Sequence, residues 1–333
     1  MARTVTIRDV AERAGVSRQT VSRAINNKGE IDSATRQRIL EVARELGYRP
    51  NRLARGLKTN RTFTLGLVVP DIANPFFAEV VRGASEVADG AGYGVLLCNT
   101  DERPDREWAI LRLLEAQRVD GLILVSSRLS EARLDEAIAA WPPIVLVNRW
   151  AQARPGLGCV LVNDARGAMV AVEHLLAKGH RRIGFVAGAP ESHSGQERRR
   201  GYRQAMGGAG LDVPEGWCVP CAPTVEGGRE AVLQLLRAHP DLTALLAYND
   251  LVALGAQQAA RELGRAVPQE LALVGWDDIV FAAHVSPPLT TLRMPKQQLG
   301  RRAMELLLAL LGDPALAPPP VMLEAELIVR EST

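Results

Sequence analysis

Twelve residues near the start of the chain, GVSRQTVSRAIN at 15–26, combine two arginines and a glutamine with several hydroxyl side chains. If a helix begins after Ser17, a favourable N-cap, a rotation of about 100° per residue puts Val21, Ala24 and Ile25 on one side. The opposite side then carries the polar residues Arg18, Gln19, Ser22, Arg23 and Asn26. Such side chains can donate to phosphates, and arginine and glutamine can also pair with guanine and adenine edges. A merely solvated helix face has the same composition, so the neighbouring segments must decide.

The segments on either side predict two more short helices. One starts at Thr6, with Asp9 placed for a capping box. Gly15 permits a sharp turn into the polar helix, which is the helix-turn-helix arrangement of DNA-binding proteins. A third helix is capped by Asp32 or Ser33. The residues expected to face the shared core are Ile7, Val10, Ala11 and Ala14 of the first helix and Ile39, Leu40, Val42, Ala43 and Leu46 of the third.

Charge separates this region from the rest of the chain. Residues 1–60 hold 13 Lys and Arg against 6 Asp and Glu, a balance of +7, whereas the whole chain carries only +2, so the remainder sums to −5. A basic unit on a mildly acidic body favours a polyanionic partner. A small helical protein-docking module, or a basic tail that is only solvated, is the alternative.

The length of the chain, its apolar runs and its cysteines limit the classes of protein to which it can belong. A length of 333 residues is too great for one hydrophobic core, so two or three domains are expected. No apolar run approaches the roughly 20 residues of a membrane span, and the amino terminus has no apolar signal core, so we expect a cytoplasmic protein. WCVPC at 217–221 is similar to a thioredoxin redox site, but it lies in an extended segment, and no second CxxC or paired histidine accompanies it. We therefore expect no metal and no cofactor.

From residue 63 onward, short β-rich runs alternate with longer helical ones, which predicts parallel sheets covered on both faces. One series runs from FTLGLVV to IVLVN; a second begins with GCVLVN and runs to LALVGW, so two doubly wound lobes are expected, divided near residue 162. TTLRM, a helix from PKQQLG, and strands near VML and ELIV would then return to the first lobe and finish in the second. The predicted fold class is α/β, with an all-α helix-turn-helix domain in front.

Ligands of such sheets bind beyond the carboxyl ends of the strands, here in the cleft between two facing lobes. The side chains placed there by sequence are Phe76, Phe77, Ser126, Ser127, Asn148 and Arg149 from the first lobe and Ser194, Arg198, Asn249, Asp250, Asp277 and Asp278 from the second. Aromatic faces with Asn, Asp and Arg suit a polyhydroxylated ring, which stacks on the aromatics and receives paired hydrogen bonds. Asp164, Asp250 and Asp278 could instead simply cap the helices that follow.

The segment from TIRDVAERAGVSRQTVSRAIN to RPNRLARGLKTNRT resembles, without gaps, the amino terminus of the lactose-repressor/galactose-repressor (LacI/GalR) family of bacterial transcription regulators. The resemblance implies that Arg18, Gln19 and Arg23 face bases. It also implies backbone contacts from neighbours such as Thr6, Ser17, Thr20, Ser22 and Asn26. Residues 51–60 match a hinge helix that folds on operator DNA, where Leu57 would wedge into a base step with Arg55 and Lys58 beside it.

The remainder resembles the regulatory core of the same family, which is itself similar to periplasmic sugar-binding proteins, through NPFF, VDGLIL, VLVNR, HLLAKGHRRIGFVAG, AYNDLVALG, LVGWDD and PLTTL. The resemblance implies that Phe76, Phe77, Ser126, Asn148, Arg198, Asn249 and Asp277 face a ligand. Many members have an acid in place of Asn148, and some have arginine in place of Ser192. The chain ends with ELIVREST, without a leucine-rich tetramerisation tail, so a homodimer is expected. The predicted domains are a helix-turn-helix domain at 1–50, a hinge at 51–60, and a regulatory core at 61–333, with a first lobe of 61–162 and 293–321 and a second of 163–292 and 322–333.

Together these features predict a ligand-responsive, sequence-specific DNA-binding regulator, a repressor of an operon for a sugar or related metabolite. Its partners would be pseudo-palindromic double-stranded operator DNA and a small sugar-like effector, with no membrane partner. The alternative is a sugar-binding receptor without a DNA role, which would share the lobes but lack the basic head. An enzyme is not expected, because the chain has no Walker loop, GxSxG or matching Ser-His-Asp set.

Overall fold

The computed structural model describes residues 5–25, 29, 31–48, 61–141 and 143–333. Contacts divide the chain into two units, residues 1–62, which we call the headpiece, and residues 63–333, which we call the core. Each unit is described on its own.

The three helices that the structure describes in the headpiece begin where capping groups are available. They are α1 (Ile7–Ala14), α2 (Arg18–Ile25) and α3 (Ser33–Glu45). The Thr6 amide donates to Asp9 Oδ2 at 2.7 Å; the Ser17 hydroxyl accepts from the Thr20 amide at 3.1 Å; and Asp32 accepts from the Thr35 amide at 2.9 Å. Each bond satisfies a donor that the first turn of a helix would otherwise leave open.

The headpiece core is small and aliphatic. Its buried residues are Val10, Ala11, Ala14, Val21, Ala24, Ile39 and Ala43. Gly15, between α1 and α2, has φ +65°, a conformation that glycine adopts without strain. The prediction for Leu40 was wrong, because this side chain is 41% exposed. It follows Ile39 by about 100° around the helix axis, which turns it away from the narrow seam that three short helices can bury.

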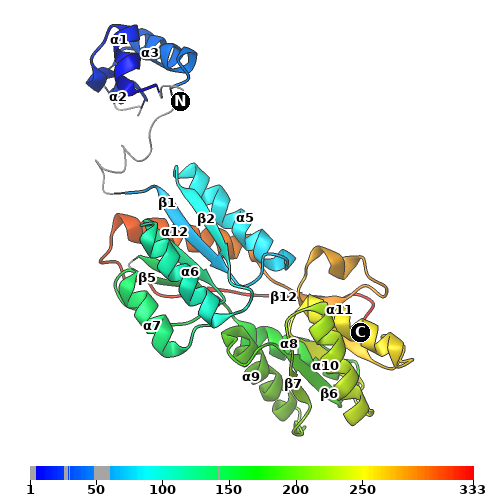
Figure 1. Ribbon diagram of the computed structural model, residues 1–333. Helices are drawn as coiled ribbons and strands as arrows, with labels where there is room; N and C mark the ends of the chain where they lie inside the picture. The colour runs from blue at the N-terminus through cyan, green and yellow to red at the C-terminus, as the bar shows by residue number, and fades with distance from the viewer. Residues whose placement is uncertain (1–4, 26–28, 30, 49–60, 142) are drawn as a thin grey trace. The chain divides into compact units, whose positions relative to one another are not determined.

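Two six-stranded sheets form the core, one in each lobe (Figure 1). The first lobe has strand order β11-β5-β4-β3-β1-β2. Its elements are β1 (Thr64–Val69), α5 (Pro75–Gly90), β2 (Gly94–Asn99), α6 (Pro104–Ala116), β3 (Gly121–Val125), α7 (Glu131–Ala140), β4 (Ile144–Val147), β5 (Leu157–Val162), α12 (Lys296–Gly312) and β11 (Val321–Leu323). The central strands β3, β4 and β5 are buried throughout, as expected where helices cover both faces of a parallel sheet.

The second lobe repeats the design with strand order β12-β10-β9-β8-β6-β7. Its elements are α8 (Asp164–Ala177), β6 (Ile183–Ala187), α9 (His193–Gly208), β7 (Cys218–Pro220), α10 (Val225–Ala238), β8 (Ala244–Ala247), α11 (Asp250–Glu262), β9 (Ala272–Asp277), the 3-10 helix η1 (Val280–Ala283), β10 (Thr290–Arg293) and β12 (Glu326–Ile328). β12 runs antiparallel to β10, and the other paired strands of this sheet are parallel.

The chain crosses between the lobes three times. GCVLVN stands at the head of the second series in the sequence pattern, but its strand, β5, pairs with β4 in the first sheet and lies within the range 61–162 that was given for the first lobe. The first crossing therefore follows β5. The second lies between β10 and α12, and the third between β11 and β12, a few residues after the boundary expected near residue 321.

Helices α5 and α12 lie side by side in the first lobe (Figure 1). A Cβ at Gly83 would lie 2.1 Å from the Gln297 carbonyl oxygen, and one at Gly300 would lie 1.9 Å from the Val80 carbonyl oxygen. A helix pair this close needs glycine on both sides. The contact holds the amino end of α5, which carries two of the predicted ligand-facing residues.

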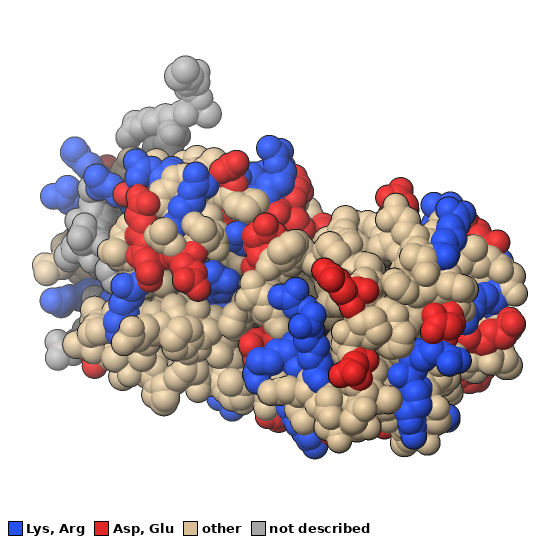
Figure 2. All heavy atoms as spheres, turned by 90° about the horizontal axis from the view of Figure 1, so that it is seen from below, with Lys and Arg blue, Asp and Glu red and all other residues tan. Residues whose placement is uncertain are grey.

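The surface of the core matches its nearly balanced charge. Acidic and basic side chains are interspersed over the face shown in Figure 2. Of the helices that the structure describes, none is long and apolar enough to cross a membrane.

Candidate functional site

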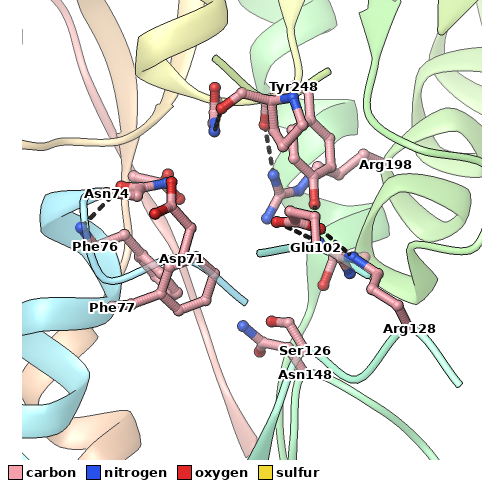
Figure 3. A pocket seen from close by; sticks show the side chains of 14 residues that line it. Asp71, Asn74, Phe76, Phe77, Glu102, Ser126, Arg128, Asn148, Arg198 and Tyr248 are labelled. Atoms are coloured by element: carbon pink, nitrogen blue, oxygen red, sulfur yellow. Dashed lines mark hydrogen bonds and ion pairs between the residues drawn. The ribbon is translucent and has the colours of Figure 1, made fainter. Parts of the chain in front are cut away.

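A pocket lies between the two lobes of the core (Figure 3). It encloses about 430 Å³, part of it open to solvent. Its lining comprises Asp71, Asn74, Phe76, Phe77, Glu102, Ser126, Arg128 and Asn148 from the first lobe and Ser194, Arg198, Pro223, Tyr248, Asn249 and Asp277 from the second. All seven residues that the family resemblance placed against a ligand therefore lie around one pocket. Of the other residues expected at the strand ends, Ser194 lines it as well, whereas Ser127, Arg149, Asp250 and Asp278 do not.

The NPFF segment brings two aromatic rings to the pocket. Asn74 caps α5 by accepting from the Phe76 amide at 3.0 Å, and Pro75 occupies the first helical turn, where its missing N–H costs nothing. The first turn then presents Phe76 and Phe77, whose rings meet edge to face with centroids 5.0 Å apart. Figure 3 shows both rings on the side of the pocket that α5 forms.

Three polar residues of the pocket lie at the carboxyl ends of strands in unusual backbone conformations. Ser126 after β3 has φ 49°, Asn148 after β4 has φ 53°, and Asp277 at the end of β9 has φ 108°. A positive φ is energetically unfavourable for any residue that has a side chain, and such residues concentrate at functional sites. Asp278, which follows Asp277, also has positive φ, at 51°. The turn of the backbone aims these side chains across the strand ends.

Arg198 of α9 is, like Arg128, a buried cation of the pocket, at 4% exposure. Its Nε donates to Asp164 Oδ1 at 2.8 Å and its Nη1 to the Tyr248 carbonyl at 2.5 Å. The guanidinium carbon lies 4.1 Å from the centroid of the Trp276 ring. Burial opposes ionisation, but Asp164 and the other nearby anions raise the pKa of Arg198 overall.

The adjacent carboxylates Asp277 and Asp278 have different surroundings. Asp278 accepts from Arg293 at 2.7 Å and from Arg330 at 2.5 Å, so both of its oxygens belong to the framework. Asp277 lines the pocket, and burial raises its pKa well above the usual range despite the nearby Arg198. The Lys296 ammonium donates to the main-chain carbonyl of Asp277 at 2.6 Å and to that of Asp278 at 2.8 Å, which holds the backbone of these two residues in place.

The other two aspartates considered from sequence also support the framework. Asp250 accepts from the Thr291 hydroxyl at 2.5 Å and from the Ile279 amide at 2.8 Å. Burial raises the pKa of Asp250 to about 7. Asp164 pairs with Arg198. None of Asp164, Asp250 and Asp278 lines the pocket.

Two buried polar atoms of the lining have no hydrogen-bond partner: Asn148 Oδ1 and Ser194 Oγ. An unsatisfied buried polar atom costs free energy that a ligand can recover. The pocket's arginines are already occupied, because Arg128 pairs with Glu102 at 2.5 Å and Arg198 pairs with Asp164. The open positions therefore suit a ligand that offers hydroxyl groups.

Six lining residues were not singled out from sequence: Asp71, Asn74, Glu102, Arg128, Pro223 and Tyr248. The strand-end rule could have found most of them, since Asp71 follows β1, Glu102 follows β2 and Tyr248 follows β8. Tyr248 also connects the lobes. Its hydroxyl lies 2.9 Å from the Ser192 hydroxyl and accepts from Arg128 Nη2 at 3.4 Å.

On the headpiece, the three residues expected to face bases are exposed: Arg18, Gln19 and Arg23. Val21 and Ala24 lie on the buried side of the same helix, as its periodicity predicted. The expected backbone contacts are on the surface or half-buried: Thr6, Ser17, Thr20 and Ser22. The predictions for Asn26, Arg55, Leu57 and Lys58 lie outside the described residues.

Comparison with known proteins agrees with this architecture. Residues 6–51 match the family model of bacterial regulatory proteins of the lacI family, and residues 172–333 match that of a periplasmic binding protein-like domain. The HTH-type transcriptional repressor PurR of Photobacterium profundum is 34% identical over 327 residues, which cover 98% of each chain. The chain belongs to the LacI family.

Two solved structures of this family resemble the whole chain. A lac repressor dimer bound to operator and the anti-inducer ONPF has a TM-score of 0.89 at 29% identity and covers 99% of both chains. A complex of the transcriptional regulator CelR with cellobiose has a TM-score of 0.76 at 32% identity and covers 99% of this chain and 100% of that one. This LacI-family protein is a ligand-responsive, DNA-binding transcriptional regulator, and a receptor without a DNA role is not favoured. Its relatives are regulators rather than enzymes.

The CxxC segment of this family member does not have the surroundings of a redox site. Cys218 and Cys221 lie in and just after the edge strand β7. Burial raises the pKa of the Cys218 thiol, and that of the Cys221 thiol to about 12. A reactive thiol needs the opposite shift. Within the described residues, no three His, Cys, Asp or Glu side chains gather in a way that could hold a metal ion.

Proposed function

We propose that this protein is a repressor whose affinity for operator DNA is set by a neutral, hydroxyl-rich molecule, a sugar or sugar derivative, in the pocket between the lobes. The observation that carries this proposal is the pair of unpartnered acceptors, Asn148 Oδ1 and Ser194 Oγ, beside arginines that are already paired. A hydroxyl can donate to either atom. An anionic ligand would have to displace a carboxylate from Arg128 or Arg198. The complex of the similar CelR with cellobiose shows a ligand of this class in a relative.

Each side of the pocket has its own part in binding. The rings of Phe76 and Phe77 provide the apolar surface against which a sugar ring packs. Asp277 accepts hydrogen bonds from adjacent hydroxyls. Asn249, whose Oδ1 accepts from the Val252 amide and whose Nδ2 donates to the Pro223 carbonyl at 3.4 Å, offers its second amide N–H. Arg198 holds this wall in place through Asp164 and Trp276.

In the headpiece, Arg18, Gln19 and Arg23 read base edges, while Thr6, Ser17, Thr20 and Ser22 position the unit on the phosphates. Contributions from Asn26, Arg55, Leu57 and Lys58 are proposed from the family resemblance alone. A repressor of this kind acts on chromosomal DNA and therefore in the cytoplasm.

Control by the ligand follows from the construction of the pocket. Because both lobes contribute to its lining, a bound molecule stabilises one arrangement of the lobes over others. Coupling between two sites of this kind amounts to about 1–3 kcal/mol, a change of roughly 5–150-fold in DNA affinity.

We further propose that the protein acts as a homodimer on a near-palindromic operator, since two identical headpieces read two related half-sites. Large apolar side chains are exposed on both lobes of the core: Leu96 and Leu97 on the edge strand β2 and Val280 and Phe281 on η1. Analytical ultracentrifugation of Phe281→Glu tests this surface, and the variant should shift the protein toward monomer.

The decisive experiment measures binding of full-length protein to a labelled operator at fixed salt, with and without candidate sugars and nucleosides. The operator would be selected from random DNA with the same protein. Asp277→Asn should keep its DNA affinity and lose the ligand response. The matched control Asp212→Asn, at an exposed position, should behave as the wild type. A normal response from Asp277→Asn at the same ligand concentration would show that the ligand binds elsewhere.

A further inference from the structure

A second crevice lies between the lobes beside the first pocket and shares Arg128 with it. It encloses about 750 Å³, part of it open to solvent. Arg133, Arg149 and Ser130 line it from the first lobe, and Gln196 lines it from α9 of the second. None of these side chains except Arg128 belongs to the first pocket.

Three arginines meet in this crevice, and they differ in their partners. Arg128 pairs with Glu102 at 2.5 Å, and Arg133 pairs with Asp105 at 2.8 Å. Arg149 has no ion pair with any carboxylate that the structure describes. Its guanidinium donates to the Leu129 carbonyl from Nη2 at 3.2 Å, while its Nε is buried without a hydrogen-bond partner.

Arg149 is nevertheless only 8% exposed. A buried cation without a counter-ion is costly, because it loses hydration without gaining a charged partner. Burial lowers the pKa of Arg149 overall; the Glu131 and Glu107 carboxylates act against this shift without reversing it, and the Arg128 cation adds to it. An anion placed against this guanidinium would offset the cost.

Other features of the crevice also favour negative charge. Helix α7 begins at its wall, with Ser130 as N-cap, and the amino end of a helix carries partial positive charge. The carboxylates that line the crevice, Glu131 and Glu191, are exposed and keep their hydration, whereas Arg128 and Arg149 are buried. Among the lining side chains, the buried charges are therefore those of the two arginines; the buried Glu107 carboxylate, which is not part of the lining, accepts from the Arg128 amide at 2.9 Å.

We propose that this crevice is a second ligand site, which binds a phosphate or carboxylate group through Arg149. The planar guanidinium offers such an oxyanion two parallel N–H donors. Because Arg149 belongs to the first lobe and Gln196 to the second, a bound anion stabilises the arrangement in which the lobes approach each other. The group can come from a free anion. It can also be an anionic arm, lying outside the first pocket, of a molecule whose neutral, hydroxyl-bearing body occupies that pocket, since Arg128 borders both; this second source rests on the proposed function.

Inorganic phosphate is the probe, added to full-length protein without DNA while sodium chloride holds the ionic strength constant. Thermal unfolding should show a saturable rise in Tm, about 2–4 °C at a concentration roughly five times Kd. Arg149→Gln should abolish the rise, and Arg261→Gln, at an exposed position on α11, should retain it. No phosphate-specific rise, or a rise that survives Arg149→Gln, would overturn the proposal, because the phosphate would then be elsewhere, including on the basic headpiece.

Arg149→Lys covers the case in which the glutamine variant does not fold. It keeps the charge but loses the planar fork, so calorimetry should show phosphate binding weakened about tenfold or more. Unchanged affinity in this variant would contradict the assignment. Ser194→Ala, which alters only the first pocket, should leave phosphate binding unchanged; if it removed binding, the phosphate would belong to that pocket and the second site would be excluded.

A second arm identifies the source of the anion by comparing sugars with their phosphate esters. A free-anion site binds inorganic phosphate and the esters with similar affinity, whatever the sugar. A site for an effector's anionic arm binds one ester far more tightly than phosphate, and that gain requires both Arg149 and Ser194. These measurements use no DNA, so they can be interpreted even if the proposed operator binding is not found.

Discussion

The headpiece and the pocket both present polar groups to a ligand, but in opposite settings. Arg18, Gln19 and Arg23 are exposed on one short helix, and the structure beneath them is a core of a few aliphatic side chains. Arg198 and Asp277 are buried between two lobes, with neighbouring groups that compensate their charge or hold their backbone. The three headpiece side chains lie on the surface, whereas many groups of the pocket are part of the fold.

This difference predicts which substitutions weaken binding alone and which also lower stability. Removing an exposed group leaves nothing unsatisfied, so the loss is confined to binding. Removing a buried charge leaves its partner desolvated and unpaired, so stability is lost together with binding. Four substitutions test this division, in order of decreasing effect.

Arg198→Ala should lower the free energy of unfolding by about 3–5 kcal/mol, because it leaves Asp164 buried without its cation. Urea denaturation of the full chain, followed by circular dichroism, measures this loss. A change below about 1 kcal/mol would mean that Arg198 serves binding alone. The buried pocket group would then behave like the exposed headpiece groups, and the difference between the two regions would not hold.

Arg18→Ala should leave stability within about 0.5 kcal/mol of the wild type, because the side chain is exposed. It should relax the base preference at one position of each half-site by about 1–3 kcal/mol. Titration of operators with single-base changes, at one salt concentration, measures the preference. A large loss of stability would show that the reading face also supports the headpiece fold.

Gly300→Ala should destabilise the core by about 1–3 kcal/mol, because the new Cβ would meet the Val80 carbonyl oxygen and push α5 and α12 apart. Gly90→Ala, at the end of α5 with open space around its Cβ, is the matched control and should be neutral or slightly stabilising. If the two variants unfolded at the same temperature, close helix packing would not be what holds the Phe76 and Phe77 side of the pocket.

Asp250→Asn tests a buried group through pH. The pKa of Asp250 is about 7 in the folded chain against an ordinary value of 3.8, so the folded state retains the proton between these limits. Its contribution to stability is therefore fully present at low pH and is lost as pH rises from about 4 to 7, with a slope of at most about 1.4 kcal/mol per unit. Asp250→Asn should remove this component from the stability-versus-pH curve. If the wild type and the variant gave parallel curves of stability against pH, the pKa of Asp250 would not be raised in the folded chain.

Much of the architecture could be predicted from local patterns. Strand–helix alternation indicated two parallel sheets, and eight of the twelve residues that the strand-end rule placed in the cleft line one pocket. Errors arose where the outcome depended on distant packing. β5 pairs with β4 although it follows a long loop, and Leu40 turned outward because the headpiece core has room for Ile39 but not for both.

The residues missed in the pocket show the same limit. Glu102 and Arg128 lie in loops after different strands, and no spacing in the chain indicates that they form an ion pair or that Tyr248 meets them from the other lobe. Side chains of these types occur in many loops. Only the sheet order shows which loops share an edge.

The amino-acid sequence alone determined which side of α2 is buried and which is exposed, because helix periodicity places eight consecutive residues without reference to anything distant. It also determined the series of strands and helices and the separation of a basic head from a mildly acidic body. Tertiary structure decided which of two adjacent aspartates faces the pocket, which arginines already have a carboxylate, and that Arg149 is buried without one. The reason is physical: whether a charged group is free or compensated depends on side chains up to a hundred or more positions away, which only the folded chain brings within hydrogen-bonding distance.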